Sequence, residues 1–267
     1  MKEWVVNRCT VTPVRMKPSE GSEQLTQLLF GEACQVLERL PRWTKISSTV
    51  DGQEGWVDFK MLSPAYNLSP ITYDLPATVV AIPMAIATDM ETGEELMLTL
   101  GTHLPNYAHG TFEVLNKKYL IDPNCVNCLE DASLQLRGEE ICATAQTLLN
   151  APYLWGGKNV MGMDCSGFTQ VVYSVFGINL LRNAREQITQ GTPVASLAEA
   201  QPGDLAFFDH ADRDPKATNI SHVGLLLDNK TIIHCSGCVH VDYIDDMGIH
   251  LPDGELTHHL VQIKRYL

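Results

Sequence analysis

One short segment constrains this chain more than any other feature, because it places a cysteine where a helix is expected to begin. The segment reads Met163-Asp164-Cys165-Ser166-Gly167-Phe168, and it is followed later by Ser221-His222-Val223-Gly224 and then by His234. Apolar residues recur at helical spacing over 168–176, so Cys165 is predicted in the first turn of a helix. Unpaired backbone N–H groups and the positive end of the helix dipole favour an anion there. The position therefore predicts a nucleophilic thiolate, although the pKa of an isolated cysteine thiol is ~8.5.

A cysteine before an apolar helix is, taken alone, more often a buried and inert thiol. The residues around Cys165 favour a reactive one. The preceding segment from Trp155 to Met163 is glycine-rich and can bring the backbone close to a ligand. Backbone N–H groups near Cys165 can also bind the oxyanion of a tetrahedral intermediate.

The two histidines lie in a pattern typical of paired strands. A turn at 201–204 precedes an apolar strand at 205–208, and a further strand is predicted over 221–227. The turn at 228–230 leads into a third strand at 231–234, so a tight hairpin is expected to bring His222 and His234 together. In that arrangement His222 would take the thiol proton and His234 would hold the imidazole in the correct tautomer. Either histidine alone would be interpreted as a strand-edge residue, but with Cys165 the set indicates a cysteine peptidase.

These motifs, in this order, resemble the NlpC/P60 family of papain-like bacterial cysteine peptidases. The resemblance covers residues 136–267. The matching segments are Pro152-Tyr153-Leu154-Trp155-Gly156-Gly157, Asp164-Cys165-Ser166-Gly167-Phe168, Leu181-Arg182-Asn183-Ala184-Arg185-Glu186-Gln187, Gln201-Pro202-Gly203-Asp204-Leu205, Ser221-His222-Val223-Gly224 and Ile233-His234. Family members cut bacterial cell-wall peptides, commonly between the side-chain carboxyl of D-glutamate and the next diamino acid. The resemblance implies that Cys165 is the nucleophile, His222 the base and His234 the third catalytic residue, with no metal or organic cofactor.

The first half of the chain shows short alternating strands broken by Gly, Pro and Asp, a rhythm typical of small β-barrels. Residues 1–63 resemble a bacterial SH3-like domain. Residues 64–130 show the same rhythm, and a second SH3-like barrel is predicted there. The expected fold class is therefore α+β: two SH3-like barrels, then a papain-like catalytic domain over 131–267 that opens with a helix at 138–150.

Two such barrels ahead of this domain resemble the γ-D-glutamyl-L-diamino acid endopeptidases, of the dipeptidyl-peptidase VI type, that process muropeptides. The resemblance implies that an amino-terminal barrel helps to recognise the free amine of an L-alanine at the start of the substrate. An ammonium group in a narrow pocket needs nearby carboxylates. One departure is that Gln53-Glu54 precede Gly55-Trp56 where relatives often have tyrosine. For Glu23, a solvated loop acid is an alternative of equal weight. The substrate-binding residues implied in this way are Asp164, Ser166, Trp155, Arg182 and Glu23.

The composition limits the classes of molecule that the protein is expected to bind. The net charge of -13 argues against nucleic acid and against an anionic membrane surface, and it suits a small peptide substrate derived from peptidoglycan. No segment approaches the ~20 apolar residues of a membrane span. A monomer is expected. The amino terminus lacks a secretory pattern, so a cytoplasmic location is expected if Met1 is the natural start, and a periplasmic or secreted one if a signal peptide was removed.

Four alternatives stay open or are set aside. Cys125, Cys128, Cys235 and Cys238 form two C-x-x-C pairs, but their long separation in the sequence argues against structural zinc, and neither pair has the context of a redox motif. An amidase or acyltransferase on the same thiol fold would share the catalytic residues and differ in its acyl pocket. A non-catalytic wall-peptide-binding module would be expected to have lost one of the three catalytic residues.

Overall fold

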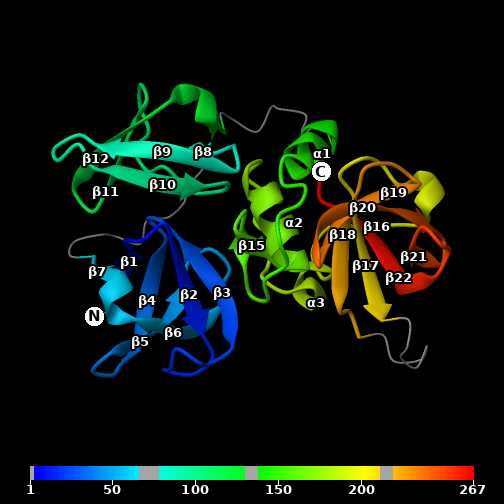
Figure 1. Ribbon diagram of the computed structural model, residues 1–267, viewed down its shortest axis with the longest axis horizontal. Coiled ribbons are helices and arrows are strands. Elements are labelled where there is room, and N and C mark those ends of the chain that lie inside the picture. Colours follow the sequence, from blue (N-terminus) through cyan, green and yellow to red (C-terminus); the bar gives the residue numbers. More distant parts are fainter. Residues whose placement is uncertain (1–2, 66–77, 130–137, 211–218) are drawn as a thin grey trace. The chain divides into compact units, whose positions relative to one another are not determined.

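The structure is a computed structural model that describes residues 3–65, 78–129, 138–210 and 219–267 (Figure 1). The chain divides into two compact units. The first comprises Met1–Ser133 together with Trp155–Val160, and the second comprises Leu134–Leu154 together with Met161–Leu267. Most of the polar segment 210–219, which connects the strands predicted at 205–208 and 221–227, lies outside the described residues. The short segment just before the nucleophile motif thus belongs to the first unit, a division that the sequence does not reveal.

The first segment of the first unit is a seven-stranded antiparallel sheet with the order β3-β2-β6-β5-β4-β1-β7. A short 3-10 turn, η1 (Phe59–Met61), precedes its last strand. Its interior is filled by alternating apolar residues such as Leu28 and Ile46, whose burial stabilises the fold by about 1.5–3 kcal/mol each. The strands are β1 (Trp4–Asn7), β2 (Val11–Arg15), β3 (Gln24–Leu29), β4 (Ala33–Arg39), β5 (Trp43–Ser48), β6 (Glu54–Asp58) and β7 (Leu62–Pro64).

The second segment of the first unit contains a four-stranded sheet of order β10-β9-β12-β11 and a two-stranded pair of β13 with β8. Tyr119 stacks on Phe112 with ring centroids 5.2 Å apart and meets Phe30 edge-on at 5.6 Å. The two segments therefore share one apolar core. The elements are β8 (Thr78–Val80), β9 (Met84–Asp89), β10 (Glu95–Thr99), β11 (Thr111–Val114), β12 (Lys117–Ile121), η2 (Pro123–Cys125) and β13 (Val126–Cys128).

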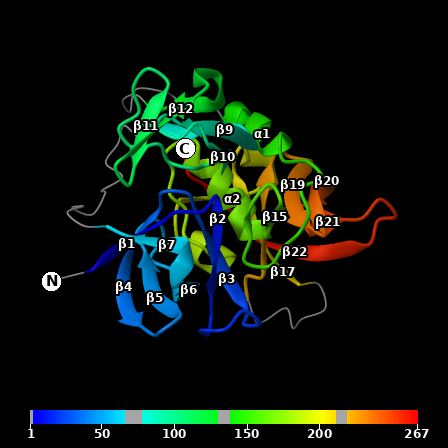
Figure 2. The same ribbon diagram turned by 60° about the vertical axis from the view of Figure 1, so that its left-hand side comes forward.

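In the described part of the second unit's sequence, the three α-helices come before the strands of a closed sheet. Strand β21 pairs with both β20 and β22, which closes the order β22-β17-β18-β19-β20-β21, and β16 adds to the edge at β22. Figure 2 shows this sheet from a second direction. The elements are α1 (Gly138–Gln146), β15 (Gly162–Met163), α2 (Cys165–Ser174), α3 (Ala184–Gln187), β16 (Thr192–Val194), η3 (Leu197–Glu199), β17 (Leu205–His210), β18 (His222–Leu226), β19 (Thr231–Ser236), β20 (Cys238–Asp245), β21 (Gly248–His250) and β22 (Leu256–Arg265), while β14 (Lys158–Asn159) lies in the first unit.

Helix α2 packs against β18 and β19, and this contact brings the nucleophile motif to the histidine hairpin (Figure 1). Residues Cys165–Tyr173 of α2 are all buried, so the helix is covered on every side. The predicted helix at 165–176 and the predicted strands at 205–208, 221–227 and 231–234 are confirmed with small shifts of their ends. The helix expected at 138–150 ends at Gln146.

Among the helices of the described ranges, none combines the length and the apolar character that a membrane crossing requires.

Candidate active site

Cys165 is the first residue of α2, and its side chain is almost covered, with 8% of the residue exposed. The helix begins there because Asp164 adopts an extended backbone and caps it. The Asp164 carboxylate accepts a hydrogen bond from the Gly167 backbone N–H at 2.7 Å, which satisfies one of the donors left unpaired at a helix start. The backbone N–H groups of Val223 and Ser166 face the Cys165 sulfur. Val223 follows His222 directly, so the thiol lies at the start of β18.

Burial, and to a smaller extent the nearby Asp164 carboxylate, raise the pKa of the Cys165 thiol to about 12. Arg182 and the two backbone N–H groups lower the pKa by less. This direction is opposite to the one expected from the helix start alone. The reason is that Asp164 occupies the helix terminus with its own negative charge, and water is excluded from the sulfur. The thiol therefore stays protonated at neutral pH unless a neighbouring base accepts its proton.

Two histidines and one aspartate form a hydrogen-bonded chain beside β18. His222 Nε2 lies 2.8 Å from His234 Nδ1, and His234 Nε2 lies 3.1 Å from Asp242 Oδ2. Burial lowers the pKa of His234, so its ring is neutral, and hydrogen bonding to His234 lowers the pKa of Asp242, which stays ionised. Because a carboxylate only accepts, His234 carries its proton on Nε2 and accepts the His222 Nε2–H at Nδ1. In this assignment Nδ1 of His222 carries no hydrogen and can accept a proton.

Gly224 leaves space for this hydrogen-bonded row of side chains. In the β18–β19 pairing it lies directly opposite His234. A Cβ atom at position 224 would lie 2.9 Å from the Cβ of His234 and 2.7 Å from Cδ1 of Ile232. Both distances are shorter than ordinary van der Waals contact. The glycine of the Ser221–Gly224 motif is thus required because any side chain there would displace the His234 ring.

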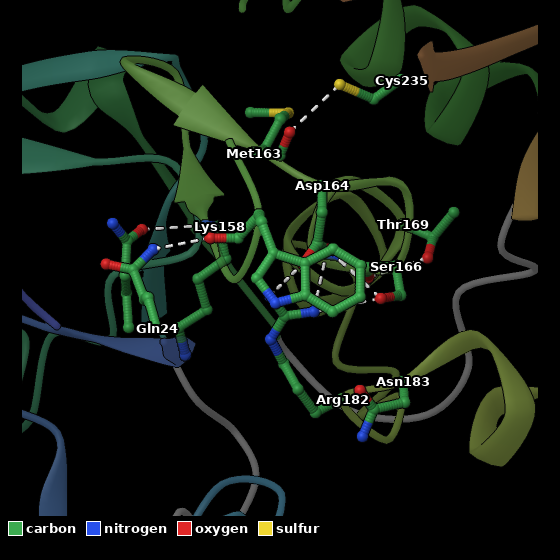
Figure 3. A network of polar contacts seen from close by, with 12 residues as sticks. Gln24, Lys158, Met163, Asp164, Ser166, Thr169, Arg182, Asn183 and Cys235 are labelled. Atoms are coloured by element: carbon green, nitrogen blue, oxygen red, sulfur yellow. Dashed lines mark hydrogen bonds and ion pairs between the residues drawn. The ribbon is translucent and has the colours of Figure 1, made fainter. Parts of the chain in front are cut away.

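Asp164, Ser166 and Arg182, three of the residues predicted to bind substrate, lie together in the second unit (Figure 3). The Arg182 guanidinium donates to both carboxylate oxygens of Asp164, at 2.9 and 2.7 Å, and to the Ser166 hydroxyl at 3.0 Å. Arg182 is 2% exposed. A buried bidentate pair of this kind neutralises the carboxylate and fixes its orientation. The geometry favours a role for Arg182 in holding Asp164.

Trp155 and Glu23, the other two predicted binding residues, lie together in the first unit. The indole Nε1–H of Trp155 donates to Glu23 Oε1 at 2.9 Å, and the Gln24 side chain donates to the Trp155 carbonyl at 3.0 Å. The same segment is anchored by a buried ion pair of 2.9 Å between Lys158 and Glu32. Trp155 itself is 60% exposed. The indole therefore presents a large apolar face to solvent while its N–H donates a hydrogen bond to the Glu23 carboxylate.

Sequence reasoning missed Asp242 and its neighbour His240. His240 pairs directly with His234 in the β19–β20 register, and Asp242 lies two residues further along β20, on the same face. The signal was present as a His-x-Asp alternation in the strand after the hairpin. All eight cysteines, each of which lies in the described part of the chain, are free thiols. Cys235 donates to the Met163 carbonyl at 3.2 Å, so its sulfur is engaged in packing.

Comparison with known proteins agrees with the two motif regions. Residues 150–248 match the model of the NlpC/P60 family, and residues 10–63 match that of the bacterial SH3 domain. The chain carries an NlpC/P60 domain. It also carries a bacterial SH3 domain, and the segment that contains Cys165, His222 and His234 lies within the NlpC/P60 match.

Two curated relatives match most of the chain. Each is named gamma-D-glutamyl-L-lysine dipeptidyl-peptidase. The protein from Bacillus cereus is 27% identical over 226 residues, which cover 78% of this chain and 66% of the relative. The protein from Bacillus subtilis is 29% identical over 221 residues, which cover 78% of this chain and 71% of the relative. The match thus spans about two thirds of the length of these relatives.

A solved structure has the same fold along nearly the whole chain. The crystal structure of an NlpC/P60 family protein from Bacillus cereus superposes with a TM-score of 0.83 and covers 99% of both chains at 21% identity. The likeness extends over the SH3 domain, the following sheets and the NlpC/P60 domain.

Proposed function

We propose that this chain is a cysteine endopeptidase that hydrolyses the γ-D-glutamyl–diamino acid bond of peptides derived from peptidoglycan. The observation that carries the proposal is the buried chain from His222 through His234 to Asp242, with the Cys165 thiol at the start of β18. A buried thiol of raised pKa needs such a base to become a nucleophile. The names of the two Bacillus relatives support the choice of bond.

In the proposed reaction, Nδ1 of His222 takes the thiol proton while the Cys165 sulfur attacks the γ-carbonyl of D-glutamate. The imidazolium formed on His222 then gives its proton to the leaving amine of the diamino acid, and a thioester remains on Cys165. A water molecule, deprotonated by the same imidazole, hydrolyses the thioester and restores the thiol. His234 accepts the second N–H of His222 throughout, and Asp242 holds His234 in the tautomer that does so.

The proposal includes recognition of a free L-alanine amine. Asp164, held in place by Arg182, is one candidate acid, and Glu23, held by Trp155, is another. Both carboxylates are fixed by a neighbour, which lowers the entropic cost of binding an ammonium group. Glu20 is a solvated acid in the same loop, exposed and 3.8 Å from Arg15, and it serves as the comparison for Glu23.

The fold we propose around this site is the α+β arrangement expected from the sequence. The helices α1, α2 and α3 precede the closed sheet, an order that supports a papain-like catalytic domain over 131–267. The short antiparallel strands over 78–128 support a second SH3-like barrel at 64–130, in addition to the SH3 domain at 1–63.

The test is a digest of L-Ala-γ-D-Glu-meso-diaminopimelate and of L-Ala-γ-D-Glu-L-Lys, read by mass spectrometry, with N-acetylated forms of both peptides. We expect release of L-Ala-D-Glu from the free peptides only, and none with Cys165→Ala. The Glu23→Gln variant should raise KM for the free peptides, and the matched Glu20→Gln variant should not. Equal cleavage of the acetylated peptides would overturn the amine roles of Asp164 and Glu23.

Two other outcomes would favour the alternatives. Transfer of the acyl group to an added amine, or release of ammonia from an amide, would indicate an acyltransferase or amidase on the same thiol fold. Binding of the peptides without cleavage would indicate a non-catalytic wall-peptide-binding module.

A further inference from the structure

Three side chains at the β19–β20 pairing present ligand atoms to one point. Nε2 of His234, Nε2 of His240 and an oxygen of Asp242 lie within 4.8 Å of one another. Each imidazole nitrogen is 3.1 Å from the same atom, Asp242 Oδ2. His234 is buried, whereas the His240 side chain is 34% exposed. The cluster is therefore accessible to solvent at His240, and its buried member, His234, is hydrogen-bonded to His222.

The two ring nitrogens of His240 both face acceptors. Nδ1 lies 2.8 Å from the Cys238 carbonyl oxygen, and Nε2 lies 3.1 Å from the Asp242 carboxylate. A neutral imidazole has one N–H, so one nitrogen then faces an acceptor without a hydrogen. A second proton satisfies this arrangement, and so does a metal ion on Nε2 while Nδ1–H donates to the carbonyl. The latter is the usual second-shell bonding of a metal-bound histidine.

The donor set defines the class of metal. Two imidazole nitrogens and one carboxylate oxygen suit Zn²⁺ and its neighbours Co²⁺ and Ni²⁺, with water in the fourth position. Bonds of about 2.0–2.1 Å in a tetrahedral site separate the ligand atoms by roughly 3.3 Å. The two nitrogen–oxygen separations of 3.1 Å are close to that value, so small side-chain rotations are enough to admit an ion.

We propose that a divalent transition metal binds His234, His240 and Asp242 and thereby inhibits the enzyme. Metal on Nε2 of His234 moves the proton of that ring to Nδ1, which then donates to Nε2 of His222. The proton of His222 consequently moves to its own Nδ1. No proton is lost, but Nδ1 can then no longer accept the thiol proton. His222 also cannot become an imidazolium, because its Nε2 would place a second N–H against that of His234. The inhibitory half of this proposal rests on the proposed function, whereas the binding half does not.

The binding half is tested with Co²⁺ on the Cys165→Ala variant, in which the nucleophile cannot serve as a ligand. We expect one bound ion with visible bands of tetrahedral nitrogen and oxygen coordination. Adding His240→Gln should weaken binding at least tenfold. The matched control is His250→Gln, because His250 forms a similar pair with Asp245, 2.9 Å apart, and it should leave binding unchanged. Equal binding in the His240 variant, or a spectrum with thiolate charge-transfer bands, would overturn the proposal.

The inhibitory half is tested by hydrolysis in the presence of Zn²⁺, with each variant compared with its own metal-free rate. We expect inhibition that a chelator reverses, and a tenfold or larger rise in the half-inhibiting concentration for His240→Gln but not for His250→Gln. Equal inhibition of the His240 variant would place the inhibitory ion elsewhere and overturn the proposal. Absence of hydrolysis without metal would refute the proposed function instead, and the Co²⁺ experiment would still decide on binding.

Discussion

Replacing Gly224 by alanine tests most sharply how the sequence motif builds the histidine chain. The added Cβ would lie 2.9 Å from the His234 Cβ, about 0.5 Å closer than the 3.4 Å at which ordinary contact begins. The backbone at Gly224 is not in the left-handed region, so the effect is steric. Overpacking of this kind costs about 1–3 kcal/mol. Because His234 Cβ is fixed close to the backbone, its ring must shift, and a displacement approaching 1 Å costs about 10²-fold in rate.

The assay measures kcat on L-Ala-γ-D-Glu-meso-diaminopimelate together with thermal unfolding of the second unit. We expect a fall in kcat of about ten- to a hundredfold and a melting temperature lower by several degrees. The variant Gly224→Ala/Ile232→Val removes the Cδ1 atom that lies 2.7 Å from the new Cβ. It should recover part of the stability but not the rate, because the contact with His234 remains. A single variant with a rate within twofold of the wild type would refute the reasoning.

Four further outcomes follow from the same geometry. Asp242→Ala should lower kcat at least tenfold with little change in KM, because His234 loses the acceptor that fixes its tautomer. Steady-state kinetics in which only KM changes, or neither constant changes, would contradict this role. Arg182→Met should destabilise the second unit by about 3–5 kcal/mol in urea unfolding, since it leaves the buried Asp164 carboxylate uncompensated, and a loss below 1 kcal/mol would contradict this. The lowered pKa of Asp242 means that its carboxylate stabilises the fold above about pH 4 and that this stabilisation is lost as the pH falls through the folded pKa, so the stability advantage of wild type over Asp242→Asn should vanish in acid and persist at neutral pH. The raised pKa of Cys165 predicts that the His222→Ala variant is not alkylated at this thiol by iodoacetamide near pH 7, and that alkylation returns only as the pH approaches 12. Equal alkylation of both proteins at pH 7 would show that His222 is not the base.

Local patterns in the sequence carried enough information to predict the hairpin that brings His222 and His234 together. The apolar spacing after Cys165 and the short turn between two apolar strands each depend on a few neighbouring residues. The same holds for the alternating strands of residues 1–63. The proximity of His222 and His234 followed from the hairpin alone, without knowledge of the rest of the sheet.

Features that depend on tertiary contacts were missed. Asp242 joins the histidine chain only through the β19–β20 register, which the sequence between them does not fix. The pKa of Cys165 was expected to fall because the helix start was considered alone, whereas burial and the capping Asp164 decide its direction. The segment Trp155–Val160 belongs to the first unit because Lys158 reaches a buried glutamate at position 32, a contact of long sequence separation.

The most direct test of the central claim is intact-protein mass spectrometry during turnover of L-Ala-γ-D-Glu-meso-diaminopimelate, with rapid acid quenching. We expect a transient adduct with the mass of an L-Ala-D-Glu acyl group, which peptide mapping assigns to Cys165 as a thioester and which Cys165→Ala lacks. Turnover with an adduct on another residue, or an undiminished rate in Cys165→Ala, would contradict it.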